Sequence, residues 1–181
     1  MYQHRDFECF IFLDLDGVMT SEDYIIKMHE CFIKDKEDPN FHYRHFMQQY
    51  CFQEEGVEFL NKLYEKYTYA IVITSTRRYE FTPDKWNFLF QLNGIKAPVI
   101  GITSKILGNG AREDEIMKYR IDNYIDDVPF LAIDDDIFDL QEINVERKLI
   151  KVTTEKGLIP YYLPQAITSI NQQKEELKNG K

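Results

Sequence analysis

The amino-acid sequence predicts an α/β protein in which a parallel β-sheet is covered by helices on both faces. Short apolar runs alternate along the chain with segments of helical periodicity, an order typical of parallel strands joined by crossover helices. The apolar runs do not alternate with polar residues, which indicates strands buried on both faces. Three of the runs also end in acidic, hydroxyl or basic residues, and the carboxyl ends of parallel strands meet at one edge of a sheet.

Five apolar segments are predicted as the strands of this sheet. They cover residues 10–13, 70–73, 99–102 and 130–133, with residues 149–152 as a fifth candidate. None of them contains the Gly, Pro or Asp punctuation that marks turns, except for the glycine at position 101. Their order along the chain, with helical segments between them, is the basis of the predicted parallel sheet.

Four segments between and after the strands are predicted as helices. Apolar residues recur at helical spacing in residues 54–67, EEGVEFLNKLYEKY. Residues 82–94 carry helix punctuation, with Thr82 as a cap, Pro83 in the first turn and Asn93-Gly94 at the exit. A third helix is predicted from residue 113 to about residue 121, and residues 163–181 read as a closing helix with a charged end.

Residues 20–53 form an irregular stretch between the first strand and the first clear helix. The stretch is rich in aromatic residues, histidine and charge, and Pro39-Asn40 breaks it. It is predicted as a small flap or cap inserted over the carboxyl end of the sheet, where ligands of open α/β sheets bind. Cys31, His42, His45 and Cys51 lie within it, but their spacing matches no common zinc site. We expect the histidines to contact substrate or solvent instead.

Composition narrows the class of protein. The chain has 181 residues, which predicts one domain over residues 1–181, and 44% hydrophobic with 29% charged residues is ordinary for a soluble globular protein. No apolar run is long enough for a membrane span, and the N-terminus lacks the order of a signal peptide, so we expect a cytosolic protein. The net charge of -9 argues against a general nucleic-acid coat. Three cysteines without a CxxC argue against a disulfide framework.

Chemistry-bearing residues follow three of the predicted strands. The first strand ends in Asp14-Leu15-Asp16-Gly17, the second runs into Thr74-Ser75-Thr76-Arg77-Arg78, and the fourth runs into Asp134-Asp135-Asp136. Because these strand ends converge, several carboxylates are expected in one crevice, where like charges disfavour ionisation. A hard divalent cation such as Mg²⁺ compensates them, since it binds carboxylate oxygens together with substrate phosphate. The metal ligands predicted in this way are Asp14, Asp16, Asp134 and Asp135.

The same groups predict phosphoryl chemistry. Asp14 is placed to attack phosphorus and form an aspartyl-phosphate. Asp16 is predicted to protonate the leaving oxygen and then to take a proton from water. Ser75 and nearby backbone N–H groups are predicted to hold the non-bridging oxygens. One of Arg77 and Arg78 is predicted to clamp the substrate phosphate, because guanidinium fits phosphate bidentately.

The order of these motifs resembles the haloacid dehalogenase (HAD) superfamily of phosphohydrolases. An apolar run before DxDG, an apolar run before Ser or Thr, a later basic residue and an apolar run before DD occur in that order over residues 10–139. The resemblance implies a Rossmann-like core, Mg²⁺, Asp14 as nucleophile and Asp16 as acid and base. FLDLDGVMT, VEFLNKL, IVITSTRR and IDDD are most similar to the small HAD domains associated with RNA-repair proteins. The spacing of Ser75 and Arg77 also resembles the phosphatase half of polynucleotide kinase-phosphatases.

Two assignments stay open at the level of sequence. Either Thr74 or Ser75 supplies the phosphate-binding hydroxyl, and we favour Ser75 because it ends the apolar run. The basic residue of the third motif is taken to be Arg112, at the start of the third helix, with Lys105 and Lys118 as alternatives. Asp136 reads as a solvated turn residue, and Asp139 either joins the acidic cluster or caps a helix.

The predicted function is a Mg²⁺-dependent phosphomonoesterase that acts through an aspartyl-phosphate. The short insert predicts an open site, which suits a large substrate such as a nucleic-acid end or a phosphoprotein better than an enclosed metabolite. The substrate we expect is a nucleotide or a nucleic-acid terminal phosphate. A sugar-acid or other small-metabolite phosphatase is the alternative, because that type shares the DGVxT opening and this chain length. A non-catalytic HAD-like binding module and a phosphotransferase or mutase are further alternatives.

Overall fold

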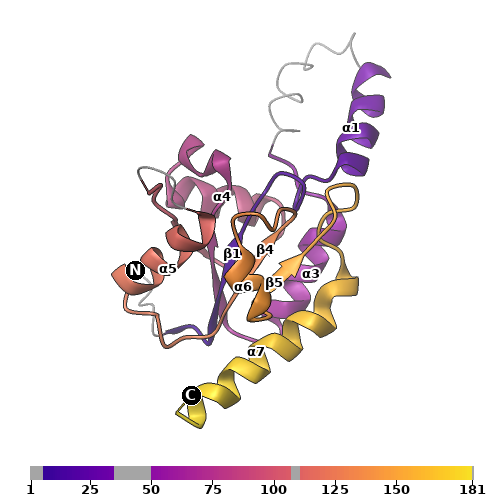
Figure 1. Ribbon diagram of the computed structural model, residues 1–181. Helices are drawn as coiled ribbons and strands as arrows, with labels where there is room; N and C mark the ends of the chain where they lie inside the picture. The colour runs from indigo at the N-terminus through magenta and orange to yellow at the C-terminus, as the bar shows by residue number, and fades with distance from the viewer. Residues whose placement is uncertain (1–5, 35–49, 107–110, 181) are drawn as a thin grey trace.

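A computed structural model of the chain describes residues 6–34, 50–106 and 111–180 (Figure 1). Its centre is a five-stranded sheet in the order β3-β2-β1-β4-β5, in which every neighbouring pair is parallel. The strands are β1 (Cys9–Leu13), β2 (Tyr69–Ile73), β3 (Val99–Ile102), β4 (Phe130–Asp134) and β5 (Leu149–Lys151). The predicted α/β class and all five predicted strands are confirmed, with strand ends shifted by one residue at most.

The strand order reverses at β1. From β1 the chain moves outward to β2 and β3 on one side, and then returns to the other side for β4 and β5. In open α/β sheets, ligands bind in the crevice outside the carboxyl ends of the strands at such a reversal. The end of β1 therefore marks the expected position of the functional site.

Both faces of the sheet are buried, as the unbroken apolar runs predict. On β1, Cys9, Ile11 and Leu13 point into one core cluster, and Phe10 and Phe12 point into the other. The first cluster includes residues of α3 (Glu54–Tyr64), α4 (Pro83–Leu92) and α7 (Leu163–Lys178). The second includes residues of α5 (Arg112–Asp122) and the short helix α6 (Gln141–Val145). Crossover helices thus cover both faces and hold the strand ends in register.

The first part of the predicted insert is a helix. α1 (Glu22–Lys34) follows the turn after β1 and extends away from the body of the protein (Figure 1). Pro39-Asn40, His42 and His45 lie outside the described residues, as does the side chain of Cys31, so the flap and zinc interpretations are not tested there. Cys51, which is within the described part, has a free thiol.

The side chain of Gln53 connects the two ends of the predicted insert to the turn that follows β5. The side-chain oxygen Oε1 of Gln53 accepts from the backbone N–H of Ser21 (3.2 Å), and Nε2 donates to the carbonyl oxygens of Lys156 and Leu158 (2.9 Å each). The backbone N–H of Glu22 donates to the carbonyl oxygen of Thr154 (2.9 Å). The start of α1 is therefore held against the turn that follows β5.

The helices agree with the prediction in most respects. α5 begins at Arg112, one residue before its predicted start. The predicted cap of α4 is present, because the hydroxyl of Thr82 accepts from the N–H of Lys85. Two 3-10 turns, η2 (Thr76–Glu80) and η3 (Pro160–Tyr162), were not predicted, and neither was α6. Among the described residues, every helix is too short or too polar to cross a bilayer.

Candidate functional site

The site begins at the carboxyl end of the two central strands. The backbone N–H of Asp14 donates to the carbonyl oxygen of Ile133 (3.0 Å), and the N–H of Thr74 donates to the carbonyl oxygen of Leu13 (3.0 Å). These ladder bonds place Asp14 between the residues that follow β2 and the acids that end β4. The convergence predicted from the apolar runs is therefore present at the level of the backbone.

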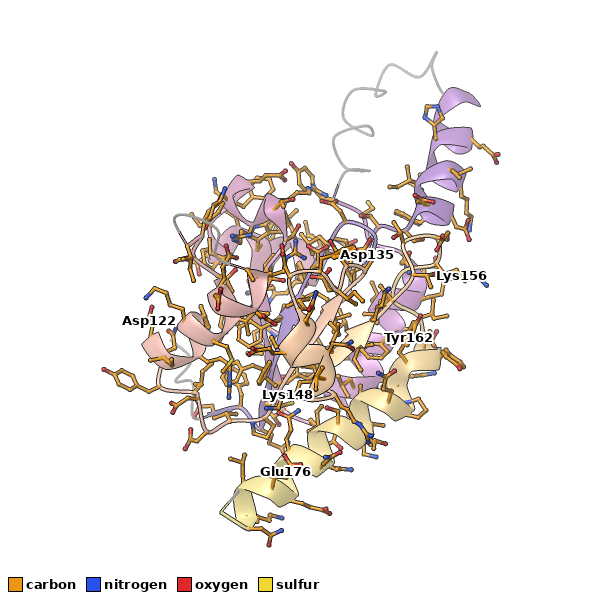
Figure 2. All side chains as sticks on the ribbon, viewed as in Figure 1. Asp122, Asp135, Lys148, Lys156, Tyr162 and Glu176 are labelled. Carbon is orange, nitrogen blue, oxygen red and sulfur yellow. The ribbon has the colours of Figure 1, made fainter. Side chains whose placement is uncertain are left out.

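Three carboxylates meet at this edge. One oxygen of each of Asp14, Asp134 and Asp135 lies within 4.8 Å of the others. Asp14 and Asp134 are buried, with 5% and 1% of their surfaces exposed. Asp135 is half-buried and accepts a hydrogen bond from the Oγ1 hydroxyl of Thr154 (2.9 Å). Figure 2 places Asp135 at the end of the sheet from which α1 extends.

Gly17 makes room for the third carboxylate. Its φ of +74° lies in the left-handed region that favours glycine. A Cβ built on Gly17 would collide with Oδ2 of Asp135. The glycine of the DxDG motif is therefore required both by the turn and by the close approach of an acid from β4.

Arg112 is the cation at the carboxylates. Its Nη1 contacts Oδ2 of Asp134 and lies 3.6 Å from Oδ1 of Asp14. Of the two alternatives, Lys118 pairs with Asp122 on the exposed side of α5 (2.7 Å), and the described contact of Lys105 joins its backbone N–H to the hydroxyl of Tyr79. Position in the fold thus favours Arg112 for the basic residue of the third motif.

In this cluster, burial favours the neutral forms of the acids more strongly than Arg112 favours their charged forms. Burial, and next the charge of Asp134, raise the pKa of Asp14 to about 7, although Arg112 acts in the opposite direction. Burial likewise raises the pKa of Asp134, against the effect of Arg112. Burial lowers the pKa of the Arg112 guanidinium, but the charges of Asp134 and Asp14 outweigh it and raise the pKa overall. One guanidinium therefore does not fully compensate these acids, and the oxygen-only donor set fits a hard divalent cation such as Mg²⁺.

The carboxylate of Asp16 lies outside the cluster of three. Its side chain is 54% exposed, and Oδ1 lies 3.3 Å from Nη1 of Arg77. Among the described residues, the side-chain oxygens that come together are those of Asp14, Asp134 and Asp135, and the assignment of Asp16 as a fourth ligand stays a prediction. Arg77 also pairs with Glu80 (3.2 Å) and lies over the ring of Tyr50, 5.2 Å from its centroid. Asp16 and Arg77 stand together beside the buried acids, with Asp16 open to solvent.

The hydroxyl pair predicted at the end of β2 is buried. Thr74 and Ser75 have 1% and 0% of their surfaces exposed. Ser75 caps the short helix η2, because its Oγ accepts from the N–H of Arg77 (3.3 Å). The two residues follow the strand beside β1, so both hydroxyls remain candidates for phosphate contact.

Of the two arginines considered for the phosphate clamp, Arg78 points into the protein. Only 5% of its surface is exposed. Its guanidinium donates to the carbonyl oxygens of Thr103, Thr74 and Ser75 and to both carboxylate oxygens of Glu115. These internal partners occupy all three nitrogens of the guanidinium, so we leave Arg78 out of the phosphate-binding set.

Two residues of this region were missed in the sequence. Thr154 is the second of two threonines that follow the fifth predicted strand in the segment LIKVTTE, so attention to polar residues just after this strand, as for the other strands, would have included it. Glu115, the partner of Arg78, lies in the third helix among other acids and carries no signal in its own sequence neighbourhood.

The sequence matches a model of a known protein family. The model is described as the HAD domain in Swiss Army Knife RNA repair proteins, and the match covers residues 10–161. This range runs from the second residue of β1 past the end of β5 and includes all the site residues discussed above, from Asp14 to Thr154. A search of the curated proteins finds no match.

Proposed function

Given that the chain belongs to the family of HAD domains in Swiss Army Knife RNA repair proteins, we propose that it is a Mg²⁺-dependent phosphomonoesterase acting on a nucleotide or nucleic-acid terminal phosphate. The observation that carries the proposal is the meeting of Asp14, Asp134 and Asp135 beside Arg112. Such a cluster gives a nucleophilic carboxylate, a place for a divalent cation and a fixed positive charge within one crevice.

The cation would be held by Asp14, Asp134 and Asp135. Carboxylate oxygens are ligands that Mg²⁺ prefers, and one oxygen from each of these acids lies within 4.8 Å of the others. When bound, Mg²⁺ would supply charge neutralisation for the phosphoryl oxygens and keep Asp14 ionised. Thr154 and Gly17 support the position of Asp135.

In the proposed first step, a carboxylate oxygen of Asp14 attacks phosphorus. The bond from phosphorus to the leaving oxygen breaks, and Asp16 donates a proton to that oxygen. In the second step, Asp16 takes a proton from water, the water oxygen attacks phosphorus, and inorganic phosphate leaves as the Asp14 carboxylate is restored. The exposed side chain of Asp16 suits this exchange of protons with substrate and solvent.

The phosphoryl oxygens need donors throughout both steps. Ser75 or Thr74 would contribute a hydroxyl, and backbone N–H groups at the start of η2 would add to it. Arg112 presents a guanidinium between Asp134 and Asp14 and would stabilise charge as it spreads over the phosphoryl group. Arg77, which lies beside Asp16, would contact the substrate phosphate bidentately.

The family description and the charge of the chain guide the choice of substrate. An RNA-repair context favours a terminal phosphate of a polynucleotide. The net charge of -9 disfavours long contact with nucleic acid, because affinity for the backbone depends on neutralised phosphates. Contact confined to the terminal nucleotides reconciles the two.

A substrate screen tests the proposal. Phosphate release is measured with Mg²⁺ from 3′- and 5′-phosphorylated oligonucleotides, nucleotides, sugar-acid phosphates and p-nitrophenyl phosphate. We expect a phosphorylated nucleotide or oligonucleotide to exceed the sugar-acid phosphates in kcat/KM by about tenfold, which corresponds to ~1.4 kcal/mol. A preference for sugar-acid phosphates would overturn the substrate assignment. Absence of turnover on every phosphomonoester would overturn the enzymatic proposal and favour a binding module.

A further inference from the structure

We propose that the buried ion pair of Arg78 and Glu115 is a positioning device that couples the hydroxyl loop after β2 to Arg112 at the start of α5. The inference rests on the proposed function, since it assigns the pair a role in placing two parts of that site. Both side chains are nearly enclosed, with 6% and 9% of their side-chain surfaces exposed, and their closest atoms are 2.8 Å apart.

Arg78 fixes the backbone of the hydroxyl loop. Its Nη1 donates to the carbonyl oxygens of Thr74 (2.9 Å) and Ser75 (3.0 Å), the two residues proposed to contact phosphate. Its Nε donates to the carbonyl oxygen of Thr103 (2.9 Å), directly after β3. The guanidinium thus joins the ends of two neighbouring strands. A planar five-donor fork can satisfy all these acceptors at once, whereas a lysine ammonium cannot reproduce that geometry.

Glu115 connects this arrangement to α5. Its carboxylate accepts from Nη2 of Arg78 at both oxygens (3.0 and 2.8 Å), and the hydroxyl of Thr103 lies 3.4 Å from Oε2. Arg112 precedes Glu115 by three residues, so the two side chains leave neighbouring positions on one helical face. A constraint on Glu115 is therefore a constraint on the first turn of α5, where Arg112 begins.

The first turn of α5 is also held from the opposite side. The backbone N–H of Glu113 donates to the carbonyl oxygen of Asp139 (2.9 Å), and a carboxylate oxygen of Glu113 accepts from the N–H of Glu142 (3.0 Å). Both partners belong to the segment that follows Asp134 and Asp135. Arg112 is consequently placed between the hydroxyl loop and the acids by contacts on two sides, and the Arg78–Glu115 pair supplies one of them.

Loss of the pair is expected to displace Arg112 and the hydroxyl loop relative to Asp14. Removing one partner of a buried pair leaves the other charge uncompensated, so the surrounding backbone adjusts. A misplacement on the order of 1 Å in a catalytic group costs up to about 100-fold in rate. The effect should fall on kcat more than on KM, since ground-state binding tolerates a displaced donor better than the transition state does.

The test compares Glu115→Gln with a control on the same helix. Asp122→Asn removes an exposed ion pair of α5, that with Lys118, and leaves the site untouched. With p-nitrophenyl phosphate and saturating Mg²⁺, well below the melting temperature, we expect Glu115→Gln to lower kcat by about tenfold or more with little change in KM. Asp122→Asn should match the wild type. If Glu115→Gln does not fold, Glu115→Asp, which retains the charge on a shorter side chain, is measured in the same way.

A double variant separates positioning from general destabilisation. Because Glu115 acts in part through Arg112, Arg112→Ala combined with Glu115→Gln should lose clearly less kcat than the product of the two single losses, the remainder coming from the displaced hydroxyl loop. Fully multiplicative losses, or a normal kcat in folded Glu115→Gln, would overturn the inference.

Amide hydrogen exchange supplies a readout that does not need turnover. In Glu115→Gln, amides in the first two turns of α5 should exchange about tenfold or more faster than in Asp122→Asn, because local opening becomes easier. Equal exchange in the two variants would overturn the coupling. If the wild type hydrolyses no phosphomonoester, the proposed function fails on its own evidence, while exchange still decides whether the pair holds α5.

Discussion

Asp14 directly follows β1, Asp134 ends the neighbouring strand β4, and both face the same guanidinium, that of Arg112. Nη1 of Arg112 contacts Oδ2 of Asp134 and lies 3.6 Å from Oδ1 of Asp14. Asp135 adds a third carboxylate to the group. The single guanidinium of Arg112 thus faces a group of three acids, two of which are buried.

Replacing the proposed nucleophile should remove activity and keep the fold. Asp14→Asn has nearly the same shape but cannot form an acyl phosphate by carboxylate attack, so turnover should fall by roughly 10³-fold or more. The measurement is phosphate release from p-nitrophenyl phosphate with Mg²⁺, with circular dichroism to verify folding and Asp122→Asn as the control. Retention of more than about a tenth of wild-type activity would contradict Asp14 as nucleophile.

The stability of the metal-free protein should depend on the ionisation of Asp14. Burial and the charge of Asp134 raise its pKa to about 7 in the folded state, whereas an unfolded aspartate has a pKa of about 3.9. Between these values the folded state binds more protons than the unfolded state, so the free energy of unfolding decreases as the pH rises. The contribution is fully present below about pH 4 and is lost by about pH 7.

Urea unfolding in EDTA from pH 4 to pH 8 measures this contribution. The comparison is with Asp14→Asn, because subtraction removes the effects of all other titrating groups. The stability of the wild type relative to the variant should decline across the range. A difference that is flat, or that rises with pH, would contradict the raised pKa.

Divalent cations should stabilise the folded protein. A ligand that binds only the folded state at 100 times its dissociation constant adds about 2.7 kcal/mol to the free energy of unfolding. We expect Mg²⁺ to raise the melting temperature of the wild type at pH 8, and Asp134→Asn to lose most of that increase. Asp122→Asn, which alters an exposed acid of α5, should keep the full increase. An equal response in Asp134→Asn and the control would argue against a cation at the three carboxylates.

Gly17→Ala should lower the free energy of unfolding by more than backbone strain alone can explain. The substitution forces a Cβ into the carboxylate of Asp135 at a φ of +74°. Gly94 has a similar φ of +80°, but a Cβ there meets nothing within 4 Å. Gly94→Ala should cost ~1 kcal/mol from the left-handed conformation alone, whereas Gly17→Ala should cost more and reduce the stabilisation by Mg²⁺.

Urea unfolding of both glycine variants, with and without Mg²⁺, makes the comparison. Because the two share the backbone conformation, the difference between them isolates the contact with Asp135. Equal losses of stability and unchanged stabilisation by Mg²⁺ would show that Asp135 moves freely and does not contribute to the cation site.

The sheet and the acid cluster were predictable because they depend on local pattern. Unbroken apolar runs predicted strands buried on both faces, and the rule that parallel strand ends converge brought Asp14 and Asp134 together. The opposite placements of Arg77 and Arg78 were not predictable. They are adjacent in sequence, and the burial of Arg78 depends on Glu115, which lies 37 positions later on another element.

The other differences between the predictions from sequence and the structure have similar causes. The helix α6 has five residues, too few for a periodic pattern to be recognised. Asp16 lies two residues from Asp14, but its carboxylate is directed toward Arg77 and solvent, which the sequence alone does not indicate. Sequence spacing indicates which residues reach the sheet edge, and side-chain direction there depends on contacts from distant segments.

The hydrogen bond between Ser21 and Gln53 joins the residue before α1 to the residue before α3. Oε1 of Gln53 accepts from the N–H of Ser21 while Nε2 holds the turn after β5, so the two ends of the segment are already joined at the sheet. The start of α1, the residue before α3 and the turn after β5 are therefore held together at one place, and Thr154 in that turn also donates to Asp135.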